Sequence, residues 1–270
     1  MKQHYLPKAA YLRFFEAPGN PGCLWLYRRG QEPILVSTEK VAKESHLYSF
    51  LTQEGELSTE VEGILGKIED EARPILQQIN AGKGDLRITA YEEIALATFA
   101  AFQAARLPAR QRETGEMLAQ VSRWLFQSHV ANVPTFQRQV DDMIAAGKQD
   151  RTTDAEKLRA EILAGRFEIT PDEKFVMATL LEGAEEIVAT FLMKRLTVLR
   201  SESECFLTSD YPVVNMPIAD HPPMRGVGFI NSHVFMPVGT RAGHSSALWL
   251  AASLPRRSPP PRSRRERYLG

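Results

Sequence analysis

The chain has 270 residues, of which 43% are hydrophobic and 24% charged, and this balance is ordinary for a folded protein and argues against a disordered one. Its 33 basic and 33 acidic residues cancel, so the overall charge predicts no general attraction to nucleic acid or acidic membranes. The cancellation is uneven. Residues 255–270 hold six arginines and one glutamate, whereas the other 254 residues hold 27 basic and 32 acidic side chains.

The N-terminal part is predicted to form a short helix followed by a β-hairpin. Pro7 suits the first position of a helix, where its missing N–H costs nothing, and an aromatic-rich stretch follows at residues 11–15. Two strand-like runs at residues 24–28 and 34–37, separated by a Gly- and Pro-containing loop, predict the hairpin.

Residues 58–194 are predicted to be helical, because apolar residues recur there every three or four positions. Four threonines are followed by glutamate three residues later, the pattern of a capping box at a helix start; they are Thr59, Thr89, Thr153 and Thr170. In the helix expected at residues 111–129, the periodicity predicts an inward-facing set made up of Met117, Val121, Trp124 and Leu125.

The C-terminal part returns to strand-like segments, expected at residues 196–199, 206–208, 213–215 and 234–238. Strands at both ends of a helical middle predict an α+β fold that is mostly α-helical. We expect the short strands of the two termini to form one small, mainly antiparallel sheet. Residues 1–241 would form a single domain. Residues 242–270, rich in Pro, Ser and Arg, are predicted to be a disordered or aberrant tail.

The composition also bears on location. The first residues lack the apolar segment of a signal peptide, and the longest apolar stretch, residues 94–105, is shorter than the about 20 residues that a membrane span needs. Cys23 and Cys205 are the only cysteines, too few for a disulfide framework. We therefore expect a cytoplasmic protein with no membrane partner.

Common catalytic signatures are missing from the sequence: it contains no phosphate-binding glycine loop, no His-Glu-x-x-His and no Cys-x-x-Cys. Two short stretches nevertheless hold chemically useful residues. His4 precedes the first helix, where it could act as a base or as a ligand, or simply lie on the surface. Ser209 and Asp210 follow a predicted strand, where they could bind a substrate or merely close a turn.

These two stretches resemble an uncharacterised, mainly bacterial family, the domain-of-unknown-function 4238 family. Its pattern pairs His-Tyr-x-Pro-x-x-Tyr-Leu-x-x-Phe with Phe-x-Thr-Ser-Asp-Asn-Pro-Val, which correspond here to residues 4–15 and 206–213. Tyr48, Glu69 and the stretch 103–108 also match family positions, so that the resemblance covers about residues 3–240. It implies membership of a fold group and no particular activity.

The chain departs from the family pattern at several positions. One extra residue lies between Pro7 and Tyr11, and Tyr211 stands where the family has asparagine. The usual Pro-Leu-Ser-Pro of the last family strand is Pro237-Val238-Gly239-Thr240 in this chain. If the family asparagine binds a ligand, Tyr211 cannot replace it in kind.

Two further positions have competing interpretations. Glu62 and Glu69 are seven residues apart and lie on nearly one face of a helix, either as paired functional carboxylates or as ordinary surface charges. Arg106 ends a very apolar helix, where it could clamp a phosphate or carboxylate, or simply favour the negative end of the helix dipole.

The leading hypothesis is a hydrolase acting on a phosphate-containing small molecule. His4 would be the general acid/base, Asp210 its orienting partner or a metal ligand, and Glu69 an auxiliary carboxylate. The substrate-binding residues would be Arg106, Ser209 and Tyr48. The sequence specifies no metal and no cofactor. The arginine-rich tail has Tyr268 as its single aromatic residue, so no specific nucleic-acid recognition is expected.

The rival hypothesis is a non-catalytic binding or regulatory module in which the terminal motifs are structural. Whether the chain is an enzyme is therefore left open at this point. A helical interaction scaffold is a third class. It would need an exposed apolar stripe, and the sequence pattern shows none clearly.

Overall fold

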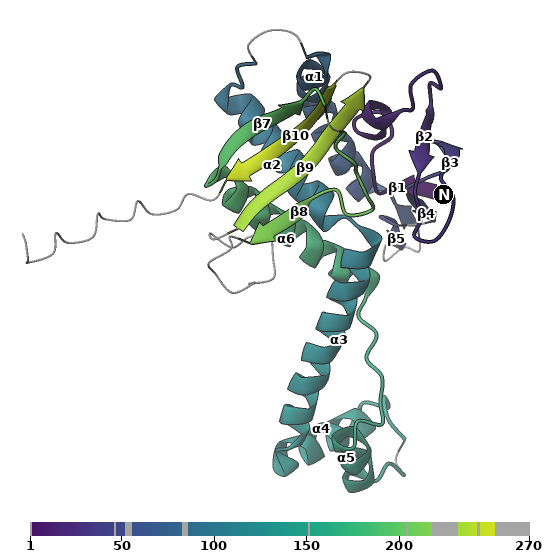
Figure 1. Ribbon diagram of the computed structural model, residues 1–270. Coiled ribbons are helices and arrows are strands. Elements are labelled where there is room, and N and C mark those ends of the chain that lie inside the picture. Colours follow the sequence, from purple (N-terminus) through teal and green to yellow (C-terminus); the bar gives the residue numbers. More distant parts are fainter. Residues whose placement is uncertain are drawn as a thin grey trace, which may run out of the picture.

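The computed structural model describes residues 2–45, 47–51, 56–82, 86–150, 152–203, 205–217, 232–241 and 244–251. Within these ranges the chain has the expected α+β fold, with six α-helices and several small antiparallel sheets. Figure 1 shows a body that contains the sheets and a helical arm that projects from it. None of the helices in the described ranges has the length and hydropathy needed to cross a membrane. Cys23 and Cys205 are both free thiols.

The helices follow the predicted apolar periodicity closely. They are α1 (Glu60–Ala81), α2 (Ala90–Ala105), α3 (Pro108–Val130), α4 (Val133–Ala145), α5 (Ala155–Leu163) and α6 (Glu173–Leu192). Of the four expected capping boxes, Thr89 with Glu92 forms in full. Thr59 occupies its cap position without a side-chain hydrogen bond, whereas Asp154 and Asp172 cap α5 and α6 in place of the predicted threonines.

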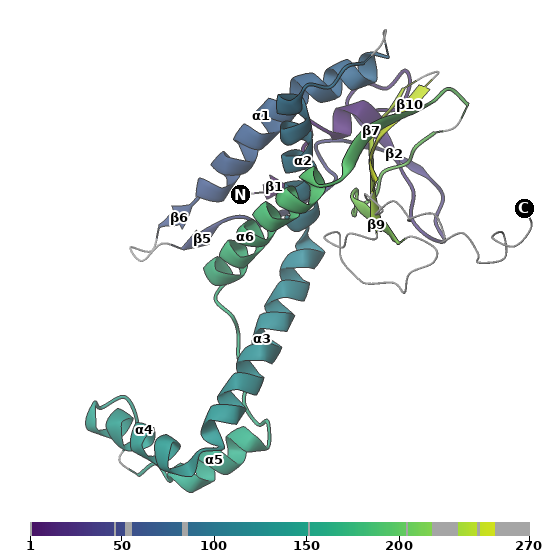
Figure 2. The same cartoon turned by 90° about the vertical axis from the view of Figure 1, so that its left-hand side faces the viewer.

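The main sheet consists of four antiparallel strands in the order β7-β10-β9-β8. The strands are β7 (Arg195–Ser201), β8 (Val214–Pro217), β9 (Ser232–Arg241) and β10 (His244–Ala251). Figures 1 and 2 show α1 and α2 packed on one face of this sheet. Residues 206–208, predicted as a strand, belong to no ladder.

The predicted domain end at residue 241 is wrong, because the strand that follows it, β10, belongs to the main sheet. β10 lies between β7 and β9 and is buried along most of its length. This strand was missed because serines at its start and the nearby Pro/Arg tract hide a short apolar core, in which Ala247, Leu248 and Leu250 are buried. The rest of the predicted tail, residues 252–270, lies outside the described residues.

The expected single sheet built from both termini is also wrong. Among the described residues the N-terminal strands pair with one another: β1 (Lys2–His4) with β4 (Lys43–Ser45), β2 (Cys23–Leu26) with β3 (Ile34–Ser37), and β5 (Phe50–Leu51) with β6 (Leu57–Ser58). Each pair lies within the N-terminal part of the chain, before α1. The two ends of the chain meet instead through side chains on a short 3-10 helix, η1 (Leu12–Phe15), which contacts β9.

The core lies where α2, η1 and the inner face of the sheet meet. Leu12 and Phe14 of η1, Phe99 of α2 and Val238 of β9 are among its almost fully buried side chains. α2 is apolar on most sides because it also packs against α1 and α6, as its composition predicts.

The arm has its own small core at its far end. There Val130, Phe136, Val140, Ala155 and Ile162 pack together, where α4 and α5 fold against the end of α3 (Figure 2). The prediction that Met117, Val121, Trp124 and Leu125 face inward is wrong, because their exposed fractions are 52%, 47%, 65% and 54%. Periodicity identified the apolar face of α3 correctly, but no described part of the chain buries it.

β9 and α1 approach each other closely at Gly239, and this approach leaves no space for a side chain at position 239. Asn80 of α1 donates hydrogen bonds to the carbonyls of Val238 (3.0 Å) and Leu76 (2.8 Å). A Cβ atom on Gly239 would lie 1.8 Å from Asn80 Oδ1. The serine that the family pattern has at this position therefore cannot be accommodated unless Asn80 moves.

We predict that Gly239→Ala lowers the free energy of unfolding by about 2 kcal/mol, because the added methyl displaces a buried, doubly hydrogen-bonded side chain. Gly63→Ala is the control. Gly63 is helical and exposed with open space around its Cβ position, so alanine should stabilise the protein by about 0.8 kcal/mol. Urea denaturation measures both, and equal midpoints for Gly239→Ala and the parent chain would contradict the prediction.

Candidate functional site

A buried polar network joins the N-terminal strand β1 to α1 and to the segment after β4. Gln3 is its centre, since its amide donates to Ser49 Oγ (3.1 Å) and to Glu62 Oε2 (3.0 Å). The Gln3 side-chain oxygen accepts a hydrogen bond from the backbone N–H of Tyr48 (2.8 Å). Gln3 is buried because successive side chains of β1 alternate between the two faces, which leaves His4 only partly covered.

Arg106 lies in the same network and is almost fully buried, with 5% of its side chain exposed. Its guanidinium donates to Glu69 Oε1 at 2.7 Å and to Gln103 Oε1 at 2.6 Å. Glu69 and Glu62 thus both face the network from α1, whereas the usual expectation for such charges is the solvated side of a helix. Gln103 in turn donates to the carbonyl of Tyr5 (2.7 Å).

The position of Arg106 leaves no room for a phosphate. The space beside its side chain is about 10 Å³, lined by apolar residues and Tyr48, which is about the volume that one water requires. Arg106 Nε is buried with no hydrogen-bond partner among the described residues. Tyr48 donates its hydroxyl to the Arg106 carbonyl (3.2 Å), and burial raises the pKa of Tyr48 above its ordinary value. These contacts support a structural role for Arg106, Glu69 and Tyr48.

The two terminal motifs meet at Tyr11 and at Tyr5. The fully buried Tyr11 hydroxyl lies 2.7 Å from Thr208 Oγ1 and donates to the carbonyl of Pro237 at 2.8 Å. Tyr5 is half-buried, and its hydroxyl lies near the Asp210 carboxylate. The pKa of Tyr5 is raised to about 12. Burial is the largest cause, and the negative charge of Asp210 is the next.

His4 does not join this arrangement. Among the described residues no hydrogen bond or ion pair connects it with Asp210 or Arg106. Its Nε2 is buried without a hydrogen-bond partner, and the nearby carboxylate is that of Glu39, which is also paired with Lys8. His4 lies on β1 opposite Lys43. The predicted His4–Asp210 pairing therefore has no direct contact to support it.

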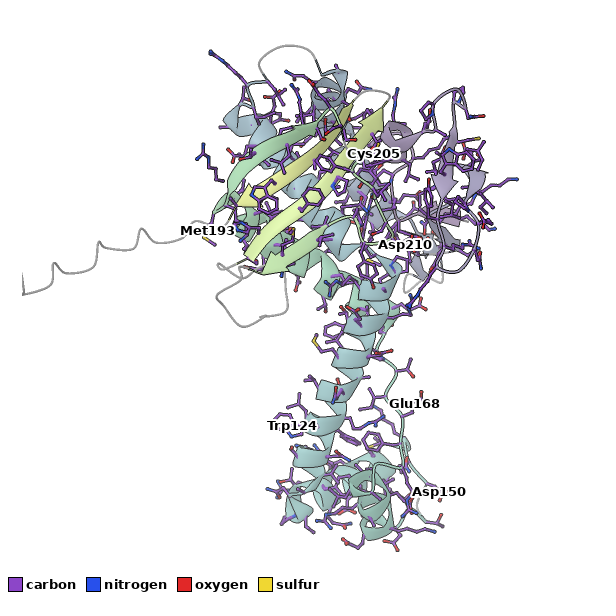
Figure 3. The ribbon with its side chains drawn as sticks, in the orientation of Figure 1. Trp124, Asp150, Glu168, Met193, Cys205 and Asp210 are labelled. Atoms are coloured by element: carbon purple, nitrogen blue, oxygen red, sulfur yellow. The ribbon has the colours of Figure 1, made fainter. Side chains whose placement is uncertain are left out.

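Ser209 and Asp210 are exposed. Figure 3 shows Asp210 at the junction between the sheet, the N-terminal segment and the root of α3. The Ser209 hydroxyl donates to the Tyr211 carbonyl (3.0 Å) and accepts from the Tyr211 N–H (3.1 Å), which closes a local turn. Tyr211 itself is 41% exposed, so the body of the protein tolerates an aromatic ring where the family pattern has asparagine.

A groove of about 300 Å³ lies beside the network, where the segment after β4, the root of α3 and the start of α6 meet. Its floor is formed by buried side chains, namely Leu47, Tyr48, Ser49, Val176 and Met177. Its rim has the exposed residues Glu44, Ser45, Arg112 and Glu173, together with the half-buried Gln111, which donates to the Leu47 carbonyl (3.1 Å). Within the described ranges no ion pair neutralises Glu44, Arg112 or Glu173.

Of the six predicted site residues, the structure brings together Arg106, Glu69 and Tyr48, and only Tyr48 lines the groove. Sequence reasoning missed Gln3, Arg112 and Glu173. The alternation of β1 could have identified Gln3, but no spacing links Arg112 with Glu173. No group of three His, Cys, Asp or Glu side chains is placed to hold a metal ion within the ranges that the structure describes.

The comparisons with known proteins agree with the motif resemblance. A family model described as "Protein of unknown function (DUF4238)" matches residues 2–243, and the chain belongs to this family. No curated protein and no solved structure matches the chain. The two motifs of this family are therefore, in this chain, the segments that Tyr11 and Tyr5 bring into contact.

We predict that Glu69→Ala lowers the free energy of unfolding by about 3 kcal/mol, because it leaves the Arg106 guanidinium buried without its counterion. Arg106→Met should cost less, since Glu69 is 23% exposed and water can solvate it. The double variant should lose less than the sum of the two single losses.

The matched control is Arg110→Ala, which breaks an exposed ion pair with Glu113 and should change stability by no more than about 0.5 kcal/mol. Urea denaturation of the four variants gives the comparison. Additive losses for Glu69 and Arg106 would show that the two side chains do not act as a pair.

The pKa of Tyr5 yields a second prediction. Asp210→Asn should lower this pKa from about 12 while leaving it above the ordinary value of 10.0, because burial is the larger cause of the shift. Glu44→Gln should lower it less. A pKa raised in the folded state means that the Tyr5 contribution to stability is complete below pH 10 and is lost as the pH rises through about 12. NMR titration of the tyrosine ring carbons measures the pKa, and an unchanged value in Asp210→Asn would contradict the contact.

Proposed function

We propose that this chain is a non-catalytic binding module whose ligand occupies the groove between the segment after β4, α3 and α6. One observation carries the proposal: the charged and amide side chains around Arg106 are engaged inside the protein, whereas the charges at the groove rim form no ion pair within the described ranges. Arg106 pairs with Glu69, and the Gln3 amide donates hydrogen bonds to Ser49 and Glu62. Glu44, Arg112 and Glu173 face the groove.

The groove favours a ligand with an apolar body and charged ends. An apolar floor beneath a few polar groups is typical of small-molecule sites, and about 300 Å³ is at the small end of their range. Carboxylates on the rim attract a cationic group, and the Arg112 guanidinium can bind a carboxylate through two parallel hydrogen bonds. The proposed ligand is therefore a small zwitterion of the amino-acid type or the end of a peptide.

Hydrolysis of a phosphate-containing substrate is the second candidate function. It is favoured by one observation, the buried and unpartnered Nε2 of His4, since an imidazole nitrogen without a structural partner is available for proton transfer. Asp210 is exposed at the surface and its carboxylate is accessible to solvent. The engagement of Arg106 with Glu69 and Gln103 weakens this candidate, because the expected anion clamp is already paired inside the protein.

We predict that phenylalanine, phenethylamine and phenylacetate bind in the groove in that order of decreasing affinity, because they present both charges, the cation alone and the anion alone. Arg112→Gln should weaken phenylalanine and phenylacetate about fivefold and leave phenethylamine unchanged. Glu173→Gln should weaken phenylalanine and phenethylamine. NMR chemical-shift titration gives the affinities.

Arg110→Gln is the control, because Arg110 is one position removed on the helix from Gln111, exposed, paired with Glu113 and outside the groove. It should bind all three probes like the parent chain. A parent chain that binds none of the probes would contradict the proposal. Turnover of p-nitrophenyl phosphate that is lost in His4→Ala would support the hydrolase instead.

A further inference from the structure

The arm helix α3 carries an apolar stripe that no described segment covers. We define the stripe by its members Met117, Val121, Trp124 and Leu125, each about half exposed or more. Their spacing of three and four residues places them on one side of the helix. Four large, exposed apolar side chains on one side of a helix form a patch of the size that is often functional on a protein surface.

The opposite side of α3 is already occupied. The chain returns from the arm tip to the body along that side, where the Phe167 ring packs edge-on against Phe126 with a centroid separation of 5.5 Å. The Arg123 guanidinium lies 5.7 Å from the centre of the same ring. Figure 3 shows Trp124 on the side of α3 away from the returning segment that holds Glu168. The stripe is therefore the free side of a helix whose other side is packed.

The order of residues along the stripe is symmetric about Val121. If a second α3 lies antiparallel across a two-fold axis at Val121, Met117 faces Leu125 of the other copy and Leu118 faces Trp124. Thr114 then faces Ser128. Each pairing matches residues of like polarity, and the small Val121 side chain meets itself on the axis, where two helices approach most closely. Self-complementarity of one patch is the requirement of a two-fold interface.

Charge also permits this pairing. The residues that border the stripe near its centre are uncharged: Thr114, Gln120, Gln127 and Ser128. Arg123 points toward Phe167 on the packed side, so that two copies bring no like charges together at the axis. A parallel pairing would instead place Glu113 and Glu116 directly against the same residues of the partner, which is unfavourable.

The area is sufficient for a small dimer interface. An aromatic side chain such as Trp124 buries about 150–250 Å² and the three aliphatic ones somewhat less, so the four half-exposed side chains offer roughly 400 Å² of apolar surface per copy. Two copies bury about 800 Å², and apolar atoms make up about 60% of a typical interface. The total is then about 1,300 Å², within the range of specific complexes and near its lower end.

We infer that the stripe on α3 binds a second copy of this chain, forming an antiparallel two-fold dimer centred on Val121. The interface is small, so the dimer dissociates on dilution. This inference is independent of the groove and of any ligand, because none of the stripe residues lines the groove.

Analytical ultracentrifugation of the full chain over a range of concentrations tests the dimer. The parent chain should show a monomer–dimer equilibrium, and Val121→Glu should weaken it more than tenfold by placing two carboxylates together on the axis. Val133→Glu is the matched control, because Val133 is 44% exposed on the same arm and lies outside the stripe. It should dimerise like the parent chain, with circular dichroism confirming that both variants are folded.

Disulfide trapping tests the antiparallel arrangement separately, in a chain in which Cys23 and Cys205 are replaced by serine. Val121→Cys should cross-link to itself under mild oxidation. Met117→Cys alone should not, because its two copies are separated by about 12 Å along the helices. A mixture of Met117→Cys with Leu125→Cys should form the heterodimer.

Four results would overturn the inference. Three of them are a parent chain that is monomeric at every concentration, a Val121→Glu chain that dimerises unchanged, and self-cross-linking of Met117→Cys in place of the mixed pair. The last would indicate a parallel arrangement. Equal weakening by Val133→Glu would also overturn it, because the stripe would then have no special role.

Discussion

The hydroxyl of Tyr11 connects the N-terminal segment with the main sheet, to which the N-terminal segment contributes no strand. It is fully buried, donates to the Pro237 carbonyl of β9 and contacts the Thr208 hydroxyl. A buried hydroxyl without partners would cost free energy, so this contact fixes both the position of η1 and its distance from the sheet. The polar network around Gln3 and Arg106 then attaches the same N-terminal segment to α1 and α2. The residues that resemble the family motifs therefore lie, in this chain, where segments distant in sequence contact each other.

Local sequence information predicted the helices well and their surroundings poorly. Apolar periodicity predicted the six α-helices of the described ranges, because a pattern of three and four residues depends only on the helix itself. The same pattern assigned Trp124 to the interior, since periodicity shows which side of a helix is apolar and not what covers it. β10 was missed for a related reason: its burial comes from β7 and β9 on its two edges, and their pairing is a property of the whole sheet.

The candidate site shows the same division. Glu69 and Arg106 were chosen from the sequence, and they do meet, but the degree of burial that makes them an internal pair depends on the segment around Tyr48 covering them. The groove could not be predicted, because its rim combines residues near positions 44, 112 and 173 with no common motif. Gly239 is intermediate. A glycine in a strand is a visible signal of close approach, but only the structure identifies Asn80 as the neighbour.

The root of the arm lies directly beside the groove, so that a small rotation at the root is amplified at the far end of the arm. α3 has 23 residues and is therefore roughly 35 Å long, while Gln111 and Arg112 at its first turn form part of the groove wall. A rotation of about two degrees at the root displaces the far end of such a helix by about 1 Å. α6 begins at the same root, with Glu173 at the rim of the groove and Val176 in its floor. A change in the width of the groove therefore changes the direction in which the arm points, and a change in the direction of the arm changes the width of the groove.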